Sequence, residues 1–330
     1  MSENMQRPCS VITDPIFTRH NLARHEERSE RLMEIDRFIP DHVVRRPAVP
    51  ASFEDLARVH DIRYIRTVER LSAREDVSFL TADTYISPGT FDVARHAAGS
   101  SVAAAVHATR GEHCFALVRP PGHHASRDRA MGFCIFNNAA VAAAAALATG
   151  IERVAILDWD LHHGNGTQEI FYSSDQVLFC SVHQQAEFPG SGWVDEIGEG
   201  EGRGFTMNAP LAPGATLADL AYVFDEAFIP ALVAHDPGLI IISAGQDMLG
   251  DDPKGGMNLW PADYGTLTRR LMDALKLPLA LVLEGGYGPS QKRAVGSILE
   301  ALAGIPFASS GGEARRSTRD VVRALIRLTG

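Results

Sequence analysis

The chain has 330 residues, which suits one large domain or two domains of average size. Hydrophobic residues make up 45% of it and charged residues 22%, so a large core can form. The net charge of −10 at pH 7 argues against a protein that binds nucleic acid through a general basic surface.

The predicted elements alternate between helices and strands. In chain order they are a helix at Thr90–Thr109, a strand at Cys114–Val118, a helix at Asn138–Ala148, strands at Arg153–Leu157 and Val177–Val182, a helix at Leu217–Ala234, a strand at Leu239–Ser243, a helix at Ala262–Leu275, a strand at Leu279–Leu283 and a helix at Ser317–Leu328. Several strands are apolar without alternation, as expected of strands covered on both faces. The pattern predicts a three-layer α/β/α fold with a mainly parallel sheet. Because no composition break divides the chain, we expect a single domain over residues 1–330.

The cysteines and the apolar runs of the sequence indicate the cellular compartment. The four cysteines are Cys9, Cys114, Cys134 and Cys180. None belongs to a C-x-x-C pair, which argues against a zinc knuckle or a redox motif, and scattered thiols fit a reducing compartment. The first ten residues hold no apolar run, and the longest apolar run, 139–148, is too short to span a bilayer. We therefore expect a cytoplasmic protein without a membrane segment.

Polar segments follow the predicted strands at the point where each strand ends. They are Arg119–His124, Asp158–Gly166, His183, Ala244–Asp247 and Glu284–Gly288. In parallel α/β sheets the functional groups gather beyond the carboxyl ends of the strands. We therefore expect these segments to carry the chemistry of the protein.

The pattern D-x-D-x-H indicates a metal centre. Asp158, Asp160 and His162 are spaced by two, so on an extended segment they point to one side. Carboxylate oxygen and imidazole nitrogen are good zinc ligands, and a catalytic zinc usually has three protein ligands. Asp247, at the end of another strand, is a plausible distant third ligand. A single aspartate at a strand end more often caps a helix, but this cluster favours a metal.

Two further motifs suggest proton transfer and oxyanion binding. The pair His123-His124 follows Pro-Pro-Gly, which forms a stiff turn, and a hydrolase needs a proton carrier. The alternative is two exposed turn histidines. Tyr287 follows two glycines that let the backbone approach a ligand, and its phenol can donate to a carbonyl or its oxyanion. The alternative is an ordinary loop tyrosine.

Five motifs occur in a fixed order along the chain. They are RPPGHH at Arg119–His124, GFCIFNN at Gly132–Asn138, DWDLHHGNGT at Asp158–Thr167, SAGQD at Ser243–Asp247 and EGGY at Glu284–Tyr287. Together they resemble the zinc-dependent histone deacetylase superfamily, which includes acetylpolyamine amidohydrolases and bacterial deacetylase-like amidohydrolases. The resemblance extends from about His20 to about Gly304 and implies an arginase/deacetylase-like fold. Asn165 and the EGGY form look like the class II branch.

The resemblance implies a role for each matching residue in hydrolysis. Asp160, His162 and Asp247 resemble the zinc ligands. His124 resembles the general base, and His123 its electrostatic partner, oriented by Asp158. Tyr287 resembles the phenol that polarises the carbonyl. Asn165 stands where many relatives carry an aspartate, and the loss of that charge should lower the pKa of His124.

The resemblance also implies a tunnel and structural cations. Phe133 and Phe188 look like the aromatic walls of an acyl-lysine tunnel, Gly132 lines it, and Asp83 is similar to a rim acid that holds the substrate's amides. A structural potassium or sodium ion would take side chains from Asp158 and Ser181 and backbone oxygens from Asp160, His162 and Val182. A second cation site would involve Phe171, Ser174, Val177 and Phe205.

Two positions separate this chain from relatives of other specificity. Arginases need a carboxylate two residues after the ligand histidine, and Gly164 stands there, so a binuclear centre is not expected. Polyamine-specific relatives carry a glutamate where this chain has Lys254, which would repel a polyamine. Lys254 therefore favours acyl-lysine in a peptide or protein; an exposed loop lysine is its alternative. Gln246 replaces the aromatic residue common before the last ligand, with an effect that the sequence does not predict.

Other functions remain open at the level of sequence. An acetylpolyamine amidohydrolase and a detoxifying amidase for other small amides would need the same reaction centre. A catalytically silent acyl-lysine binder would be expected to lack Tyr287, a histidine or a zinc ligand, and this chain has all of them. The oligomeric state, monomer or homo-oligomer, is also open.

Overall fold

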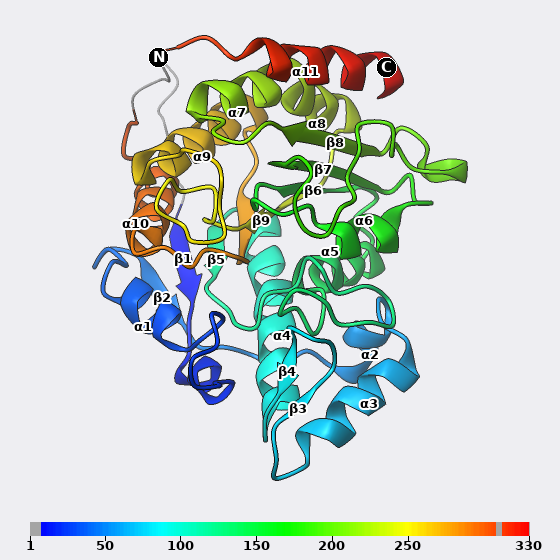
Figure 1. Cartoon of the computed structure of the whole chain (residues 1–330), viewed down its shortest axis with the longest axis vertical. Helices are drawn as coiled ribbons and strands as arrows, with labels where there is room; N and C mark the ends of the chain where they lie inside the picture. Colours follow the sequence, from blue (N-terminus) through cyan, green and yellow to red (C-terminus); the bar gives the residue numbers. More distant parts are fainter. Residues whose placement is uncertain (1–7, 308–311, 330) are drawn as a thin grey trace.

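A central parallel sheet organises the computed structural model, which describes residues 8–307 and 312–329 (Figure 1). The eight-stranded sheet has the order β2-β1-β5-β10-β9-β6-β7-β8, and every neighbouring pair is parallel. The strands are β1 (Cys9–Ile12), β2 (Val44–Arg46), β5 (His113–Ala116), β6 (Val154–Asp158), β7 (Val177–Gln184), β8 (Thr206–Leu211), β9 (Leu239–Ala244) and β10 (Leu279–Leu283). A separate antiparallel pair is formed by β3 (Ser78–Phe79) and β4 (Tyr85–Ile86).

Helices cover both faces of the sheet. The α-helices are α1 (Glu30–Asp36), α2 (Phe53–Ala57), α3 (Ile62–Ser72), α4 (Thr90–Thr109), α5 (Asn138–Ala148), α6 (Asn165–Phe171), α7 (Leu217–Val223), α8 (Ile229–His235), α9 (Pro261–Leu275), α10 (Gln291–Leu302) and α11 (Arg316–Thr329). Short 3-10 turns lie at η1 (Pro15–Arg19) and η2 (Gly200–Gly202), and a π-turn, η3 (Phe224–Phe228), joins α7 to α8. In Figure 1, α4 and α5 lie on the opposite side of the sheet from α7, α8, α9 and α10. The three-layer parallel fold predicted from the sequence is confirmed.

Local sequence explains the elements that pack most closely. All of β6, β9 and β10 is buried, in agreement with their continuous apolar character. The alanine-rich α4 and α5 contact each other and neighbouring strands, and the small side chains permit this close approach. At Gly99 in α4 an added Cβ would lie 2.2 Å from the backbone nitrogen of Ala51, so only glycine fits there.

The predicted boundaries agree with the structure for α4, α5 and β10 and lie within a few residues for the other predicted strands. The helix predicted over Leu217–Ala234 is interrupted by the π-turn of η3. Five strands have no counterpart among the predicted elements, namely β1, β2, β3, β4 and β8. Both β1 and β2 are very short, and β8 contains Asn208 and Pro210, which are unfavourable in strands. Within the described residues, no helix combines the length and the apolar character needed to cross a bilayer.

Candidate active site

Three side chains from two strand ends converge as a candidate metal centre. The Nδ1 atom of His162 lies 3.1 Å from Oδ1 of Asp160 and 3.1 Å from Oδ2 of Asp247. Asp160 and Asp247 are fully buried, and each of the three residues offers one ligand atom within 4.8 Å of the others. Two buried carboxylates are costly side by side unless a cation compensates them. Two carboxylates with one imidazole fit a zinc ion, so the donor set matches the metal that the motifs imply.

Backbone groups orient the candidate ligands. Asp158 ends β6, and its Oδ1 accepts the N–H of Asp160 at 3.0 Å. The N–H of Gly285 donates to Oδ2 of Asp160 at 2.8 Å, and the N–H of Leu161 donates to Oδ1 of Asp247 at 2.8 Å. Each of the two aspartates is therefore held by an amide while its other oxygen faces His162. This support fixes the direction of the remaining lone pairs.

Electrostatics distinguish the two ligand carboxylates. Burial raises the pKa of Asp160, but His123 and His162 outweigh it and hold the pKa below its usual value. Burial and the neighbouring charge of Asp160 raise the pKa of Asp247 to about 7. Like charges this close disfavour double ionisation, and a bound cation removes that conflict.

The two histidines of the RPPGHH motif have different partners. Nδ1 of His123 lies 3.0 Å from Oδ2 of Asp158, and Nδ1 of His124 lies 2.8 Å from Oδ1 of Asn165. Because an amide oxygen only accepts, His124 carries its proton on Nδ1, and Nε2 is free to take another. The rings lie 3.9 Å apart between centroids. The sequence analysis paired each histidine with these same partners.

The surroundings of His123 and His124 shift their pKa values in opposite directions. Burial lowers the pKa of His123, but Asp160 and Asp158 outweigh it and raise the pKa to about 10. Burial lowers the pKa of His124 well below its usual value, and the neighbouring His123 and His162 lower it further. Neighbouring groups whose environments push their pKa values apart are typical of acid/base catalysis.

Tyr287 lies in the middle of the loop between β10 and α10, and a residue that the sequence analysis missed holds this loop. Arg31 donates from Nη2 to the carbonyl of Glu284 at 2.7 Å and from Nε to the carbonyl of Gly286 at 2.8 Å. Its guanidinium carbon lies 4.5 Å from the centroid of the Tyr287 ring. Burial raises the pKa of Tyr287 well above its usual value, so the phenol keeps its proton and can donate it in a hydrogen bond.

Glu284 is a second supporting residue without a predicted role. Its Oε2 accepts the N–H of Gly122 at 2.6 Å and the N–H of His123 at 3.1 Å. Burial raises the pKa of Glu284 to about 7. The carboxyl group therefore ties the loop after β10 to the turn that carries the histidine pair.

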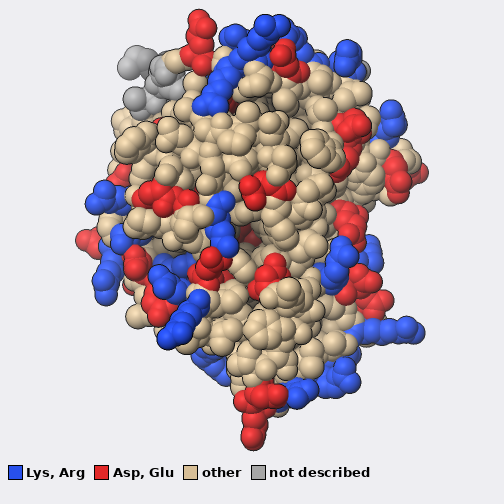
Figure 2. All heavy atoms as spheres, viewed as in Figure 1, with Lys and Arg blue, Asp and Glu red and all other residues tan. Residues whose placement is uncertain are grey.

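A cavity of about 520 Å³ leads from the surface to these residues. Its lining includes Asp160, His162, Asp247, His123, His124, Gly132, Phe133, Phe188, Tyr287, Asp83, Lys254 and Glu26. Near the centre of the face in Figure 2, acidic and basic side chains surround a hollow. The Phe188 ring meets His124 edge-on at 5.1 Å, and the Phe133 ring meets Tyr287 edge-on at 5.8 Å. The structure thus brings the predicted ligands, histidines, phenol and walls into one cavity.

Phe133 lines this cavity with an unusual backbone. Its φ is 69°, in the left-handed region that non-glycine residues rarely adopt, and the preceding Gly132 has φ 55°. The N–H of Phe133 donates to the hydroxyl of Thr84 at 3.0 Å, and that hydroxyl donates to Oδ1 of Asp83 at 2.9 Å. Asp83 and Thr84 therefore support the backbone of Phe133, and both Asp83 and Phe133 line the cavity.

Lys254 lies at the mouth of the cavity and forms an ion pair with Glu26. Glu26 belongs to the segment 24–31 that also supplies Arg31. The sequence analysis treated Lys254 as a free positive charge, whereas the structure partly neutralises it. The Lys254 side chain still reaches the rim of the cavity and is 35% exposed.

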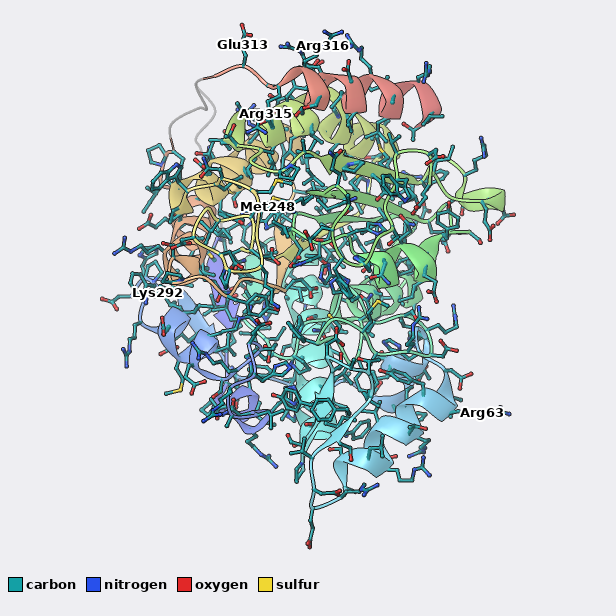
Figure 3. All side chains as sticks on the ribbon, viewed as in Figure 1. Arg63, Met248, Lys292, Glu313, Arg315 and Arg316 are labelled. Atoms are coloured by element: carbon teal, nitrogen blue, oxygen red, sulfur yellow. The ribbon has the colours of Figure 1, made fainter. Side chains whose placement is uncertain are left out.

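Gln246 is buried and hydrogen-bonded through its side chain and its backbone. Its Nε2 donates to the carbonyl of Ala244, and its Oε1 accepts from Nε2 of Gln291 at 3.1 Å. The backbone N–H of Gln246 donates to the carbonyl of Gly285 at 3.0 Å. This polar pair therefore packs beneath the glycine loop. The next residue after Asp247, Met248, is also fully buried and lies near the centre of the view in Figure 3.

Within each of the two predicted cation sites, some of the residues lie close together. Asp158 and Ser181 are register partners on β6 and β7, and Oγ of Ser181 lies 2.9 Å from Nδ1 of His183. In the second set the N–H of Ser174 donates to the carbonyl of Phe171 at 3.0 Å. The carbonyl of Phe205, another member of the second set, accepts from the N–H of Phe179 at 2.9 Å.

Comparison with known proteins gives consistent matches. The family model described as "Histone deacetylase domain" matches residues 19–302. A "Histone deacetylase-like amidohydrolase" of Pseudomonas aeruginosa is 41% identical over 292 residues, which cover 86% of this chain and 74% of that protein. A "Probable deacetylase" of Archaeoglobus fulgidus is 41% identical over 276 residues, covering 80% and 76%. The structure titled "Crystal Structure of HDA15 HD domain" matches with a TM-score of 0.91 at 33% identity and covers 98% of this chain and 95% of that one.

Proposed function

The chain belongs to the histone deacetylase family of amide-hydrolysing enzymes, and we propose that it removes acyl groups from the ε-amine of lysine in peptides or proteins. We propose that residues 1–330 form a single catalytic domain for this reaction. One observation carries the proposal. The candidate ligands Asp160, His162 and Asp247 share a cavity with a histidine pair and a protonated phenol.

Asp160, His162 and Asp247 would hold one zinc ion. When bound, the ion supplies a Lewis acid for the amide carbonyl and makes water more acidic. The match of the three donors to zinc chemistry supports this assignment. The proposal also includes a structural potassium or sodium ion near Asp158 and Ser181, and a second near Phe171 and Ser174.

The chain's own residues then perform the proton transfers. His124, with its proton on Nδ1 directed to Asn165, takes a proton from the attacking water on Nε2 and later gives one to the leaving amine. His123, paired with Asp158, stays charged beside it and lowers the proton affinity of His124. The phenol of Tyr287 donates a hydrogen bond to the oxygen that becomes negatively charged. Phe133 and Phe188 line the route of the acyl-lysine chain.

Tyr287→Phe tests the chemistry of this site. Loss of one oxyanion donor costs about a hundredfold or more in kcat. The assay is steady-state hydrolysis of an acetyl-lysine peptide, with zinc content measured on the same samples. Tyr222→Phe on α7 is the matched control and should leave kcat unchanged, because Tyr222 does not line the cavity. Unchanged kcat in Tyr287→Phe with full zinc content would refute the proposed role.

An acetylpolyamine amidohydrolase is the second candidate function. Acidic groups at the mouth, Asp83, Glu187 and Glu26, favour a cationic substrate, whereas Lys254 opposes one. Glu26 is already paired with Lys254, so the acidic side of the rim is weaker than its composition suggests. A substrate panel separates the two functions: acetyl-lysine and longer acyl-lysine peptides, trifluoroacetyl-lysine, acetylputrescine and acetylspermidine. Hydrolysis of the polyamines alone would overturn the proposed substrate class.

A further inference from the structure

We propose that Asp252 is a positioning residue for Tyr287, acting through the backbone of the loop that carries the phenol. The inference rests on the proposed function, since it takes Tyr287 to be the hydrogen-bond donor of the reaction. Asp252 does not line the catalytic cavity and cannot touch a substrate there. Any effect of Asp252 on the reaction is therefore indirect, and two of its three backbone contacts lie in the loop that carries Tyr287.

Three backbone amides donate hydrogen bonds to the carboxylate of Asp252. Oδ2 accepts the N–H of Tyr287 at 2.6 Å and the N–H of Gly288 at 2.8 Å, while Oδ1 accepts the N–H of Lys254 at 2.9 Å. The residue is 7% exposed, so water does not replace these contacts readily. All three partners donate, which suits a carboxylate that accepts on both oxygens.

The loop after β10 needs support from outside because it has few side chains of its own. Tyr287 is flanked by Gly286, with φ 119°, and by Gly288. Glycine leaves the backbone free to adopt many conformations, so neighbouring side chains cannot fix the phenol. The close approach at Gly288, where an added Cβ would lie 3.0 Å from the carbonyl oxygen of Asp251, brings the two loops into contact.

Arg31 binds carbonyl groups of the loop that carries Tyr287, and Asp252 binds amide groups of the same loop. Arg31 donates to the carbonyls of Glu284 and Gly286, and its guanidinium stacks on the phenol ring. Asp252 accepts from the amides of Tyr287 and Gly288. The loop is thus held by a cation on its carbonyls and an anion on its amides. Removing either hold lets the phenol move relative to the substrate carbonyl.

Asp252→Asn is the variant that tests the idea. It keeps the size of the side chain but turns one acceptor oxygen into an NH₂ group that faces backbone N–H donors. A donor misplaced by about 1 Å costs on the order of a hundredfold in rate. We expect kcat to fall by about ten- to a hundredfold, KM to change by less than about twofold and zinc content to stay constant.

A double-mutant cycle separates positioning from a general structural role. If Asp252 acts through Tyr287, Asp252→Asn lowers kcat no further in the Tyr287→Phe background. A structural role would lower kcat by the same factor in both backgrounds, which would overturn the inference. Asp273→Asn, at an exposed aspartate on α9 that does not line the cavity, is the control and should leave kcat unchanged.

The outcomes also distinguish the inference from the proposed function. Unchanged kcat in Tyr287→Phe defeats the proposed function itself. A slow Tyr287→Phe with a fully active Asp252→Asn defeats only the inference. If Asp252→Asn does not fold, Asp252→Glu replaces it in the same cycle. That variant keeps the charge but shifts the carboxylate by one methylene, and the same outcomes support or overturn the role.

Discussion

Glu27→Gln removes the central charge of a buried cluster beneath the catalytic loops. Glu27 accepts from Nε of Arg119 at 2.8 Å and from Nη1 of Arg31 at 2.9 Å, and its second oxygen pairs with Nη2 of Arg119. The side chains of Glu27 and Arg119 are fully buried, and that of Arg31 is 5% exposed. The substitution keeps the shape of the side chain but leaves two guanidinium groups buried without a counter-charge.

The expected loss is large because the remaining charges cannot reach water. Removing one partner of a buried ion pair costs about 3–5 kcal/mol in the free energy of unfolding. Native proteins of ordinary stability have only about 5–15 kcal/mol in total. Urea unfolding followed by circular dichroism measures the difference. Asp273→Asn breaks the exposed Arg269–Asp273 pair on α9 and should cost only about 0.3–0.5 kcal/mol.

The pH dependence of this loss has a defined sign. Burial raises the pKa of Glu27, but the guanidinium groups of Arg119 and Arg31 outweigh it and lower the pKa below its usual value. Because the folded-state pKa is lowered, the charge stabilises the fold above the ordinary value of about 4.5 and loses this effect as pH falls through the folded-state pKa. The gap between wild type and Glu27→Gln should therefore be complete at pH 7 and shrink in acid. A loss below about 1 kcal/mol at pH 7 would refute the reasoning.

Two further predictions concern the catalytic wall and a buried histidine. At Gly132, with φ 55°, an added Cβ would lie 2.4 Å from Cδ2 of His124, so Gly132→Ala should lower kcat/KM about tenfold or more. Gly150→Ala shares the positive φ but meets no atom within 4 Å, and equal activity losses in the two variants would contradict the steric explanation. Burial lowers the pKa of His60 to about 4, and its Nε2 accepts the N–H of Asn137, so the neutral ring stabilises the fold above about pH 6.5. The free energy of unfolding of the wild type, measured in urea, should fall by up to about 1.4 kcal/mol per pH unit from pH 6.5 toward 4. An identical slope in His60→Gln would count against this explanation.

Local sequence identified the parts of the molecule whose signals are local. Continuous apolar runs marked β6, β9 and β10, and alanine-rich composition marked α4 and α5. The parallel sheet then required the polar segments at the strand ends to share one edge. The convergence of the motif residues in one cavity agrees with that requirement. Short or polar strands such as β2 and β8 carried no comparable signal.

Supporting residues were beyond prediction because their contacts join distant segments. Arg31 reaches the carbonyl of Gly286 across 255 positions, and no spacing rule connects the two. Asp252 was visible only as a loop aspartate, and Lys254 as a free lysine, until the fold brought Glu26 beside it. Hydrogen bonds and ion pairs of this kind depend on how loops pack against one another.

The sequence by itself determined the family and the parallel α/β class, and it identified the side chains that we propose hold a metal and move protons, because each of these follows from residue type at short spacing. Only the tertiary structure decided how those groups are held, since that depends on loops from opposite ends of the chain. The buried Glu27–Arg119–Arg31 cluster, the two-sided hold on Tyr287 and the paired charge of Lys254 all arise from such loop packing. Their geometry sets how precisely the proposed catalytic side chains are positioned.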